Sequence, residues 1–261
     1  MMRALALEYH DIVASAEQDN SGFPGPSSGS YKLAPNNFAE HVRAVTARGS
    51  VVTPRQALAG GALRPIMLTF DDGGLSASTV AAPILEGAGC RGVFLMTTDY
   101  IGKPTFLSRA QLRELHERGH VVGSHSCSHP VRMAALTRDA LRREWRDSVK
   151  VLEDVIGAPI DTASVPGGYF SRVVAETAAE AGIRFLFTSE PSRRVVDIDG
   201  CAVIGRYTLR QWHGKEHAAG FVAPLSPARV SEWLRWNALK IAKRLLGERY
   251  LVLRGKMFRE T

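Results

Sequence analysis

Two carboxylates stand side by side in a glycine-rich turn. Residues 69–74 read TFDDGG and directly follow the apolar run at residues 65–68. Adjacent carboxylates repel one another and are costly to desolvate together, and a bound cation removes both difficulties. The competing interpretation is a solvated Asp-Gly turn that holds no ligand. The pair Asp71 and Asp72 therefore predicts a cation site.

Two histidines follow another apolar run, at residues 120–124. His125 and His129 are four residues apart, so both imidazoles reach one metal ion if the segment turns helically. With one of the two aspartates they form a two-histidine, one-carboxylate donor set that leaves positions open for water and substrate. We expect Zn²⁺, with Co²⁺, Ni²⁺, Mn²⁺ or Fe²⁺ as alternatives. Cys127 is expected on the rim, pointing away from the ligands.

A third motif, VPGGY at residues 165–169, ends one apolar run and opens a helix-like segment. Consecutive glycines allow backbone N–H groups to approach a ligand closely, as an oxyanion hole requires. A routine turn between a strand and a helix explains the same letters. Gly167 and Gly168 are therefore candidate oxyanion or substrate contacts.

The strands that precede these three motifs determine where the motifs lie in the fold. Apolar runs predict strands at 3–9, 50–52, 65–70, 92–97, 120–124, 162–165, 184–188 and 201–206, and amphipathic stretches predict helices at 38–48, 78–87, 109–118, 138–155 and 171–181. This alternation predicts parallel strands covered by helices, an α/β fold. We expect a closed or nearly closed barrel, with an open doubly wound sheet as the alternative. In a barrel, the three motifs meet at the C-terminal ends of the strands.

Length and composition indicate one folded domain. The 261 residues are 45% hydrophobic and 23% charged. No uncharged apolar stretch of about 18 residues is present, so a membrane span is not expected. Glu8 interrupts the first apolar run too early for a secretory signal, and three cysteines form no disulfide framework. We therefore expect a cytoplasmic protein, with a barrel over residues 1–226. Its Gly/Ser/Pro-rich loop at 14–35 is either a lid or a surface insertion.

The positive charge is concentrated at one end of the chain. The net charge is +7, and residues 229–261 hold nine Lys and Arg against three Glu. The rest is close to neutral, which argues against a surface built to grip nucleic acid. Residues 227–261 are expected to form a basic amphipathic helix and tail. Three alternatives are open for this helix. It packs as the last barrel helix, or it binds an acidic protein, or it docks on anionic membrane lipid. The docking residues would be Trp233, Trp236 and the cluster of Lys240, Lys243 and Arg244.

The motifs resemble those of the polysaccharide deacetylases, the NodB-homology or carbohydrate esterase 4 family. Residues 69–73 match the family's T-F-D-D-G motif and residues 125–129 its H-[ST]-x-x-H motif. Residues 164–168 stand where the family has R-x-P-[YFG]-G. The resemblance covers roughly residues 60–206. It implies a distorted (β/α)₇ barrel and metal-dependent removal of acetyl groups, usually from N-acetylated amino sugars.

The resemblance also implies a role for each matching position. Asp72 would bind the metal together with His125 and His129. Asp71 would be the general base that deprotonates the metal-bound water. The backbone N–H of Gly167 would share the oxyanion with the metal.

The sequence departs from the family pattern at two places. Ser164 stands where many members have an arginine that orients the catalytic aspartate, and Arg206 is our candidate to supply that charge. The usual Leu-x-His near the C-terminal strand is missing. A subset of the family has an N-terminal Tyr-His instead, which corresponds to Tyr9 and His10. We therefore expect His10 to be the general acid, with His213 or His217 as the fallback.

The leading hypothesis is an enzyme that deacetylates an N-acetylated sugar in a polysaccharide, oligosaccharide or glycoconjugate precursor. On the same scaffold, an O-acetyl esterase or a non-sugar amide hydrolase is the alternative. A catalytically inactive sugar-binding protein is the third candidate, supported only by the serine at position 164. The expected partner is an acetylated carbohydrate, in the cytoplasm or beside a membrane.

Overall fold

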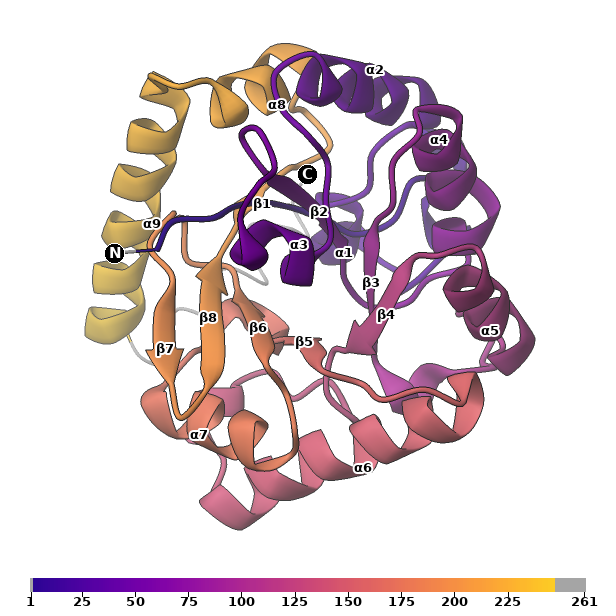
Figure 1. The fold of residues 1–261 in the computed structure, drawn as a ribbon, viewed down its shortest axis with the longest axis vertical. Helices are drawn as coiled ribbons and strands as arrows, with labels where there is room; N and C mark the ends of the chain where they lie inside the picture. The colour runs from indigo at the N-terminus through magenta and orange to yellow at the C-terminus, as the bar shows by residue number, and fades with distance from the viewer. Residues whose placement is uncertain (1, 247–261) are drawn as a thin grey trace.

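The computed structural model describes residues 2–246, with side chains described to residue 240, and contains one curled, mostly parallel sheet (Figure 1). The strands are β1 (Leu5–Tyr9), β2 (Ile66–Phe70), β3 (Val93–Met96), β4 (Val121–Ser124), β5 (Thr162–Ser164), β6 (Phe185–Thr188), β7 (Val196–Ile198), β8 (Cys201–Gly205) and β9 (Tyr207–Thr208). Their order is β7-β8-β6-β5-β4-β3-β2-β1-β9.

The sheet curls round because one chain segment pairs at both ends of it. β8 and β9 are separated only by Arg206; β8 pairs with β6 and β9 with β1, both in parallel. The segment thereby joins the first strand to the last, which confirms the expected distorted (β/α)₇-type barrel of mostly parallel strands. β7 is the exception, an antiparallel strand that pairs with β8 at the margin.

Most helices surround the sheet on its outer side (Figure 1). They are α2 (Pro35–Thr46), α4 (Ala82–Gly87), α5 (Arg109–Glu117), α6 (Arg138–Ile156), α7 (Arg172–Glu180), α8 (Lys215–Val222) and α9 (Pro227–Leu246). Two short helices, α1 (Pro26–Gly29) and α3 (Pro54–Ala59), lie within this ring in the same view. A π-helical turn, Ala77–Ala81, leads into α4. Ser108 caps α5 in a reciprocal capping box with Gln111, which fixes where that helix begins.

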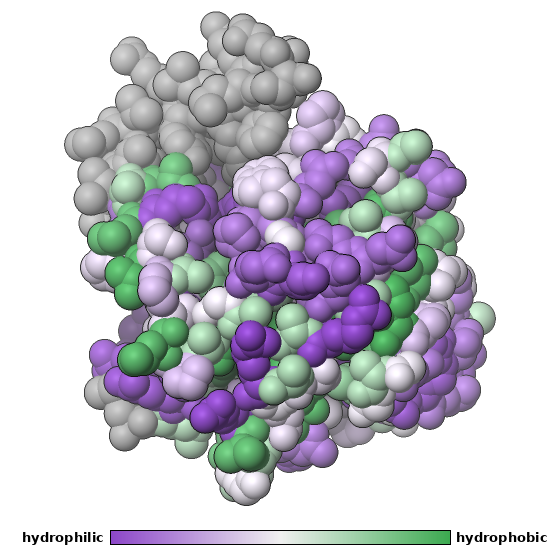
Figure 2. Space-filling model, turned by 90° about the horizontal axis from the view of Figure 1, so that it is seen from above, coloured by the Kyte–Doolittle hydropathy of each residue, from purple (hydrophilic) through white to green (hydrophobic). Residues whose placement is uncertain are grey.

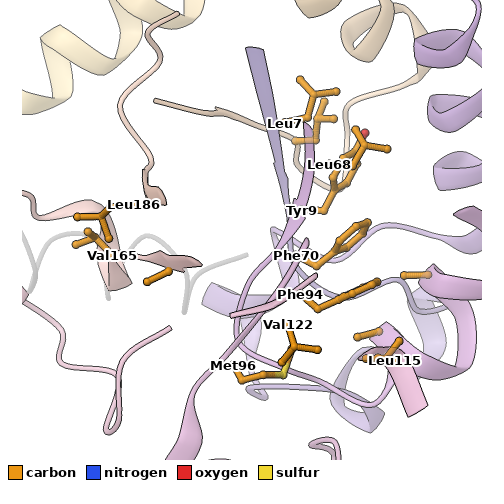
Figure 3. Close-up of a cluster of buried hydrophobic side chains, with 14 of the residues drawn as sticks. Leu7, Tyr9, Leu68, Phe70, Phe94, Met96, Leu115, Val122, Val165 and Leu186 are labelled. Atoms are coloured by element: carbon orange, nitrogen blue, oxygen red, sulfur yellow. The ribbon is translucent and has the colours of Figure 1, made fainter. Parts of the chain in front are cut away.

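Alternate residues along each strand face two different environments, as the two-residue period of a strand requires. Leu5, Leu7 and Tyr9 of β1 pack outward against the helices, in the cluster shown in Figure 3. Ala4 and Ala6 point the other way, into a smaller cluster with Met67 and Ile204. This smaller cluster, which also contains Phe187, therefore fills the lower interior of the barrel.

On the face shown in Figure 2, smaller hydrophobic areas lie among the hydrophilic residues of the described surface. Within residues 2–246, no helix is both long enough and apolar enough to cross a membrane. Basic helix α9 exposes Val230, Trp233 and Leu234. The remainder of the predicted basic tail, residues 247–261, lies outside the described residues.

Two local expectations are wrong. The run at 50–52 forms only a single bridge, between Val51 and Ile66, because Pro54 starts α3 two residues later. The segment 14–35 is not an irregular loop throughout. It contains a 3₁₀ turn, Ser15–Asn20, and the short helix α1, and Lys32 donates to three of its carbonyl groups: those of Gln18, Ser21 and Phe23.

Candidate metal and catalytic site

The site occupies the upper interior of the barrel, beyond the C-terminal ends of the strands. Glu8, Thr69 and Asp71 follow the interior positions Ala6 and Met67 at the two-residue period of β1 and β2. The backbone N–H of Asp71 continues the ladder by donating to the carbonyl of Tyr9 at 3.0 Å. Toward the C-terminal ends of these strands, the side chains that face the barrel interior therefore change from apolar to polar.

Asp72, His125 and His129 converge on one point. The Nε2 atoms of His125 and His129 lie 3.5 and 3.4 Å from Asp72 Oδ1. That oxygen is buried and has no hydrogen-bond partner among the described residues. Zinc bonds of about 2.0–2.1 Å separate two tetrahedral ligands by roughly 3.4 Å, so the donor set fits a zinc-sized ion. The His129 side chain is 27% exposed, which leaves the cluster open on that side.

Left-handed backbone conformations bring these ligands together. Asp72, Ser126 and His129 have φ angles of 75°, 65° and 58°, an uncommon conformation for residues with a Cβ atom. The histidine segment therefore does not turn helically as expected. Glu144 of α6 instead holds its shape by accepting hydrogen bonds from the N–H groups of Cys127 and Ser128, both at 2.9 Å.

Ser164 determines which nitrogen of His125 faces the cluster. Its hydroxyl donates to Asp71 Oδ1 at 3.0 Å and lies 2.6 Å from His125 Nδ1. A carboxylate only accepts, so the single hydroxyl proton goes to Asp71 and Nδ1 must carry its own proton. Nε2 of His125 is then the unprotonated nitrogen, and it is the one that faces Asp72. A metal-binding imidazole requires this tautomer.

Arg206 forms a two-pronged ion pair with Asp71. Nη1 lies 2.7 Å from Oδ1 and Nη2 lies 2.7 Å from Oδ2. The guanidinium is fully buried and also donates to Glu8 at 3.0 Å. The structure thus places an arginine on Asp71 from the β8–β9 junction, in addition to the Ser164 hydroxyl.

The cationic neighbours of the two aspartates keep both of them ionised, and burial keeps His125 neutral. Burial raises the pKa of Asp71, but Arg206 and His125 outweigh it and hold the pKa below its ordinary value. Burial likewise raises the pKa of Asp72, and the surrounding histidines lower it further than burial raises it. For His125, burial lowers the pKa to about 4. Burial also lowers the pKa of His129, but Asp72 outweighs burial and raises it above its ordinary value. A neutral imidazole and an ionised carboxylate are the forms that bind a metal ion, so His129 must lose its proton when the metal binds.

His10 lies on the Asp71 side of the cluster. One donor atom each from His10, Glu8 and Asp71 falls within 4.8 Å of the others. Its Nδ1 is buried and has no hydrogen-bond partner among the described residues, and its ring packs on Tyr31 at 4.8 Å. His213 and His217 instead stack on each other at 4.4 Å, and His213 accepts from the Arg210 N–H. Neither of them joins the two donor clusters found among residues 2–240.

Comparison with known proteins agrees with this geometry. The family described as Polysaccharide deacetylase matches residues 61–186, which include the aspartate and histidine motifs and Ser164. Residues 61–186 of the chain therefore match the polysaccharide deacetylase family. The Bacillus subtilis protein YxkH is 24% identical over 172 residues, 63% of this chain and 61% of YxkH. The chain therefore spans less than two thirds of that curated relative.

Two solved structures show the same fold. BC0361, a polysaccharide deacetylase from Bacillus cereus, aligns with a TM-score of 0.72 at 19% identity, covering 85% of this chain and 69% of BC0361. The Streptococcus pyogenes deacetylase PplD, solved in complex with acetate, aligns with a TM-score of 0.67 at 19% identity, covering 85% of this chain and 99% of PplD.

The glycine turn begins three residues after Ser164, at the same end of the barrel. Gly167 and Gly168 both have left-handed φ angles, 65° and 69°. A Cβ atom on Gly167 would lie 2.8 Å from the Val131 carbonyl oxygen, and one on Gly168 would lie 3.1 Å from Trp236 of α9. The two glycines are therefore required by backbone conformation and close packing.

The segment 14–35 packs directly against the metal-ligand cluster. The ring of Phe23 lies 4.9 Å from that of His129 and 5.1 Å from that of Phe106. Buried Asp11 anchors the segment by accepting from Ser21 and Ser76. The segment thus forms one wall of the site.

Sequence reasoning missed Glu8 and the role of Ser164. Glu8 is buried and accepts from Arg206, Ser189 and Thr208. A glutamate inside an otherwise apolar strand was an available signal, because burying a carboxylate without a partner is costly. No sequence signal showed that the Ser164 hydroxyl would lie between His125 and Asp71.

Proposed function

We propose that this chain is a metal-dependent deacetylase that removes N-acetyl groups from an amino sugar in a polysaccharide, oligosaccharide or glycoconjugate precursor. One observation carries the proposal: the Asp72, His125 and His129 donor set lies beside an aspartate that a buried arginine keeps ionised. A divalent ion held there would supply an activated water and polarise the acetyl carbonyl.

Asp71 is the general base in this proposal. Its Oδ1 already accepts from Arg206 and Ser164, whereas Oδ2 accepts only from Arg206 among the described residues. Oδ2 therefore has the free lone pair that takes the proton of the attacking water. Arg206 and Ser164 fix the orientation of the carboxylate, so little reorganisation precedes that transfer.

His10 is the general acid. As the C–N bond breaks, the departing amine needs a proton, and His10 is the imidazole beside Asp71 that does not belong to the donor set. The backbone N–H of Gly167 is our candidate to stabilise the oxyanion, because its turn lies at the same end of the barrel. The products are acetate and a free amino sugar.

The finer assignments belong to this proposal as well. We expect Zn²⁺, since two imidazoles and one carboxylate suit it, with Co²⁺, Ni²⁺, Mn²⁺ or Fe²⁺ as alternatives. We also propose that residues 1–226 form the deacetylase barrel with 227–261 as a basic helix and tail, and that the protein acts in the cytoplasm. The match to the polysaccharide deacetylase family supports a carbohydrate substrate, and the acetate complex of PplD supports acetate as a product.

Acetate release from two substrate classes tests this function. The purified chain is assayed with N-acetylglucosamine oligomers and with an O-acetylated sugar, before and after treatment with a chelator. We expect chelator-sensitive release from the N-acetyl substrate. Release from the O-acetyl substrate alone indicates an esterase, and release that survives complete metal removal contradicts the proposed chemistry.

A further inference from the structure

A cavity of about 260 Å³ opens at the end of the barrel opposite the catalytic cluster. Leu5 and Ile66, the first residues of β1 and β2, line this cavity, whereas Asp71 directly follows the last residue of β2. Strand β2 has five residues, which corresponds to a length of about 16 Å. The cavity is therefore separate from the metal and catalytic site.

Four arginines dominate the lining of this cavity. Arg3, Arg64, Arg193 and Arg229 line it together with apolar side chains, and no acidic residue is among the described residues around it. Guanidinium groups in one cavity repel one another, and apolar walls strengthen the repulsion because they exclude water. An anion bound between the four charges would replace this repulsion by attraction.

The four charges have no anionic partner in the described part of the chain. None of the four arginines forms an ion pair within residues 2–240. The Nε atom of Arg193 is buried and has no hydrogen-bond partner there. Burial, and then the charge of Arg193, lower the pKa of Arg229 below its ordinary value. The cavity therefore holds positive charge that no described carboxylate balances.

Two of the arginines are held in place by the fold. The guanidinium of Arg229 donates to carbonyl groups at the C-terminal end of α8 and just beyond it, those of Phe221, Ala223 and Pro224. The backbone of Arg193 is fixed beside β1, because its carbonyl accepts from the Ala4 N–H at 2.9 Å. Less conformational freedom is therefore lost when an anion binds to these residues.

The chemistry of the lining indicates a phosphate monoester. The paired N–H donors of a guanidinium match two oxygens of a phosphate group. A phosphate monoester carries a charge of about −1.5 to −2 and three acceptor oxygens, whereas a carboxylate offers one charge and two oxygens. The cavity volume is several times the roughly 30 Å³ that one water molecule occupies, so a phosphate group fits.

Exposed apolar side chains adjoin the cavity. Met2, Leu63, Leu225 and Val230 are each more than half exposed, and each is the chain neighbour of a residue that lines the cavity. Two sources of the phosphate group are compatible with this surface. A soluble monoester leaves these side chains in water, whereas the headgroup of an anionic lipid brings them to the acyl boundary of a membrane.

We propose that the cavity lined by Arg3, Arg64, Arg193 and Arg229 binds the phosphate group of a phosphate monoester, either a soluble molecule or a lipid headgroup. This site goes beyond the proposed deacetylase function and is independent of it, since it lies at the other end of the barrel. A failed deacetylase assay would leave phosphate binding at this site unaffected.

The double variant Arg64→Gln/Arg193→Gln tests the site, because it removes two of the four charges and leaves Arg229 in place at the end of α8. The matched control is Arg109→Gln/Arg143→Gln, which removes two exposed arginines from α5 and α6. The probe is glycerol 3-phosphate, titrated calorimetrically. We expect roughly 10- to 100-fold weaker binding to the first variant than to the wild type, and unchanged binding to the control. Equal binding to all three proteins overturns the inference.

Chemical protection tests the same site in the wild-type protein. Phenylglyoxal modifies exposed arginines, and peptide mass spectrometry gives the rate at each position. We expect saturating glycerol 3-phosphate to slow the modification of Arg64 several-fold, because the bound phosphate covers it, and to leave Arg109 unaffected. If Arg64 is modified equally fast with and without the probe, the proposed site is wrong.

Vesicle flotation distinguishes the two sources of phosphate. Each protein is mixed with phosphatidylcholine vesicles that contain or lack phosphatidic acid. Capture that requires phosphatidic acid and is lost in the Arg64→Gln/Arg193→Gln variant assigns the site to a lipid headgroup. Calorimetric binding of glycerol 3-phosphate without such capture assigns it to a soluble monoester. If the wild type shows neither, the inference is contradicted.

Discussion

At the scale of single residues, Ser164 is the most informative residue, because it stands where many polysaccharide deacetylases have an arginine. Its hydroxyl spans His125 Nδ1 and Asp71 Oδ1 and fixes the imidazole tautomer. The arginine's charge comes from Arg206, at the junction of β8 and β9. In this chain Ser164 therefore helps to orient Asp71, and Arg206 supplies the paired positive charge.

Ser164→Ala is expected to weaken metal binding roughly 10- to 100-fold, because His125 Nδ1 loses the acceptor that fixes its tautomer. Competition with a chromogenic chelator measures this affinity. Thr177→Val, which removes a buried hydroxyl from α7 that bonds only to carbonyl groups of its own helix, is the control and should bind metal like the wild type. Equal affinities for all three proteins contradict the role of Ser164.

Arg206→Lys replaces a planar fork by a single ammonium group and cannot keep both bonds to Asp71. Arg206 lowers the pKa of Asp71, so the weaker pairing raises it, and a higher pH is needed to ionise the base. We expect the acidic limb of the pH profile of kcat/KM to move upward, with activity reduced about 10-fold or more. Arg138→Lys, which changes an arginine in a surface ion pair, is the control. If the acidic limb of the Arg206→Lys profile stays at the wild-type pH, this role of Arg206 is contradicted.

The sequence predicted Asp71, Asp72, His125 and His129 as a group because each pair is adjacent or closely spaced. It predicted Arg206 only as a candidate, because residue 206 is distant in sequence from Asp71. Glu8 was not predicted as a partner, since its role depends on β1 and β9 lying side by side. Local motifs are thus visible in the sequence, whereas contacts across the barrel require the fold.

At the scale of elements, the segment 14–35 departs most from expectation. Its Gly, Ser and Pro content predicted an irregular loop, yet Lys32 and Asp11 draw it down against the site. Buried Lys32 donates to three carbonyl oxygens at 2.6–2.7 Å, which no composition argument would reveal. Elements with strong periodicity, such as α5 and α6, were predicted within one residue at each end.

Lys32→Met should release this segment, because methionine cannot donate to the carbonyls of Gln18, Ser21 and Phe23. Limited proteolysis is expected to cleave residues 15–29 several-fold faster than in the wild type, as local opening becomes easier. Lys103→Met, at an exposed lysine, is the control. If cleavage within 15–29 stays as slow as in the wild type, other contacts hold the segment.

At the scale of the whole molecule, closure of the barrel was predictable from the number of strands and their alternation with helices. The β8–β9 junction was not, because a single residue separates two strands that pair at opposite ends of the sheet. Closure also buries histidines far from the site. His213 directly precedes the N-cap of α8, and it contacts His41 through its carbonyl and Phe221 through its ring.

Burial lowers the pKa of His213 to about 4, so the folded protein binds fewer protons than the unfolded chain between about pH 6.5 and 4. The free energy of unfolding therefore falls as the pH falls through this window, by roughly 1–2 kcal/mol from this residue. His213→Asn should flatten that dependence in denaturant titrations, while His116→Asn on α5 should not. Parallel curves for wild type and His213→Asn contradict the assignment.

The central claim is that Asp71 acts as the base beside a metal held by Asp72, His125 and His129. The rate of acetate release by metal-loaded Asp71→Asn tests it most directly, because the amide keeps the size of the side chain and cannot accept the proton. We predict the wild-type metal content and a rate lower by about 10²-fold or more. Deacetylation at the full wild-type rate by this variant would contradict the account.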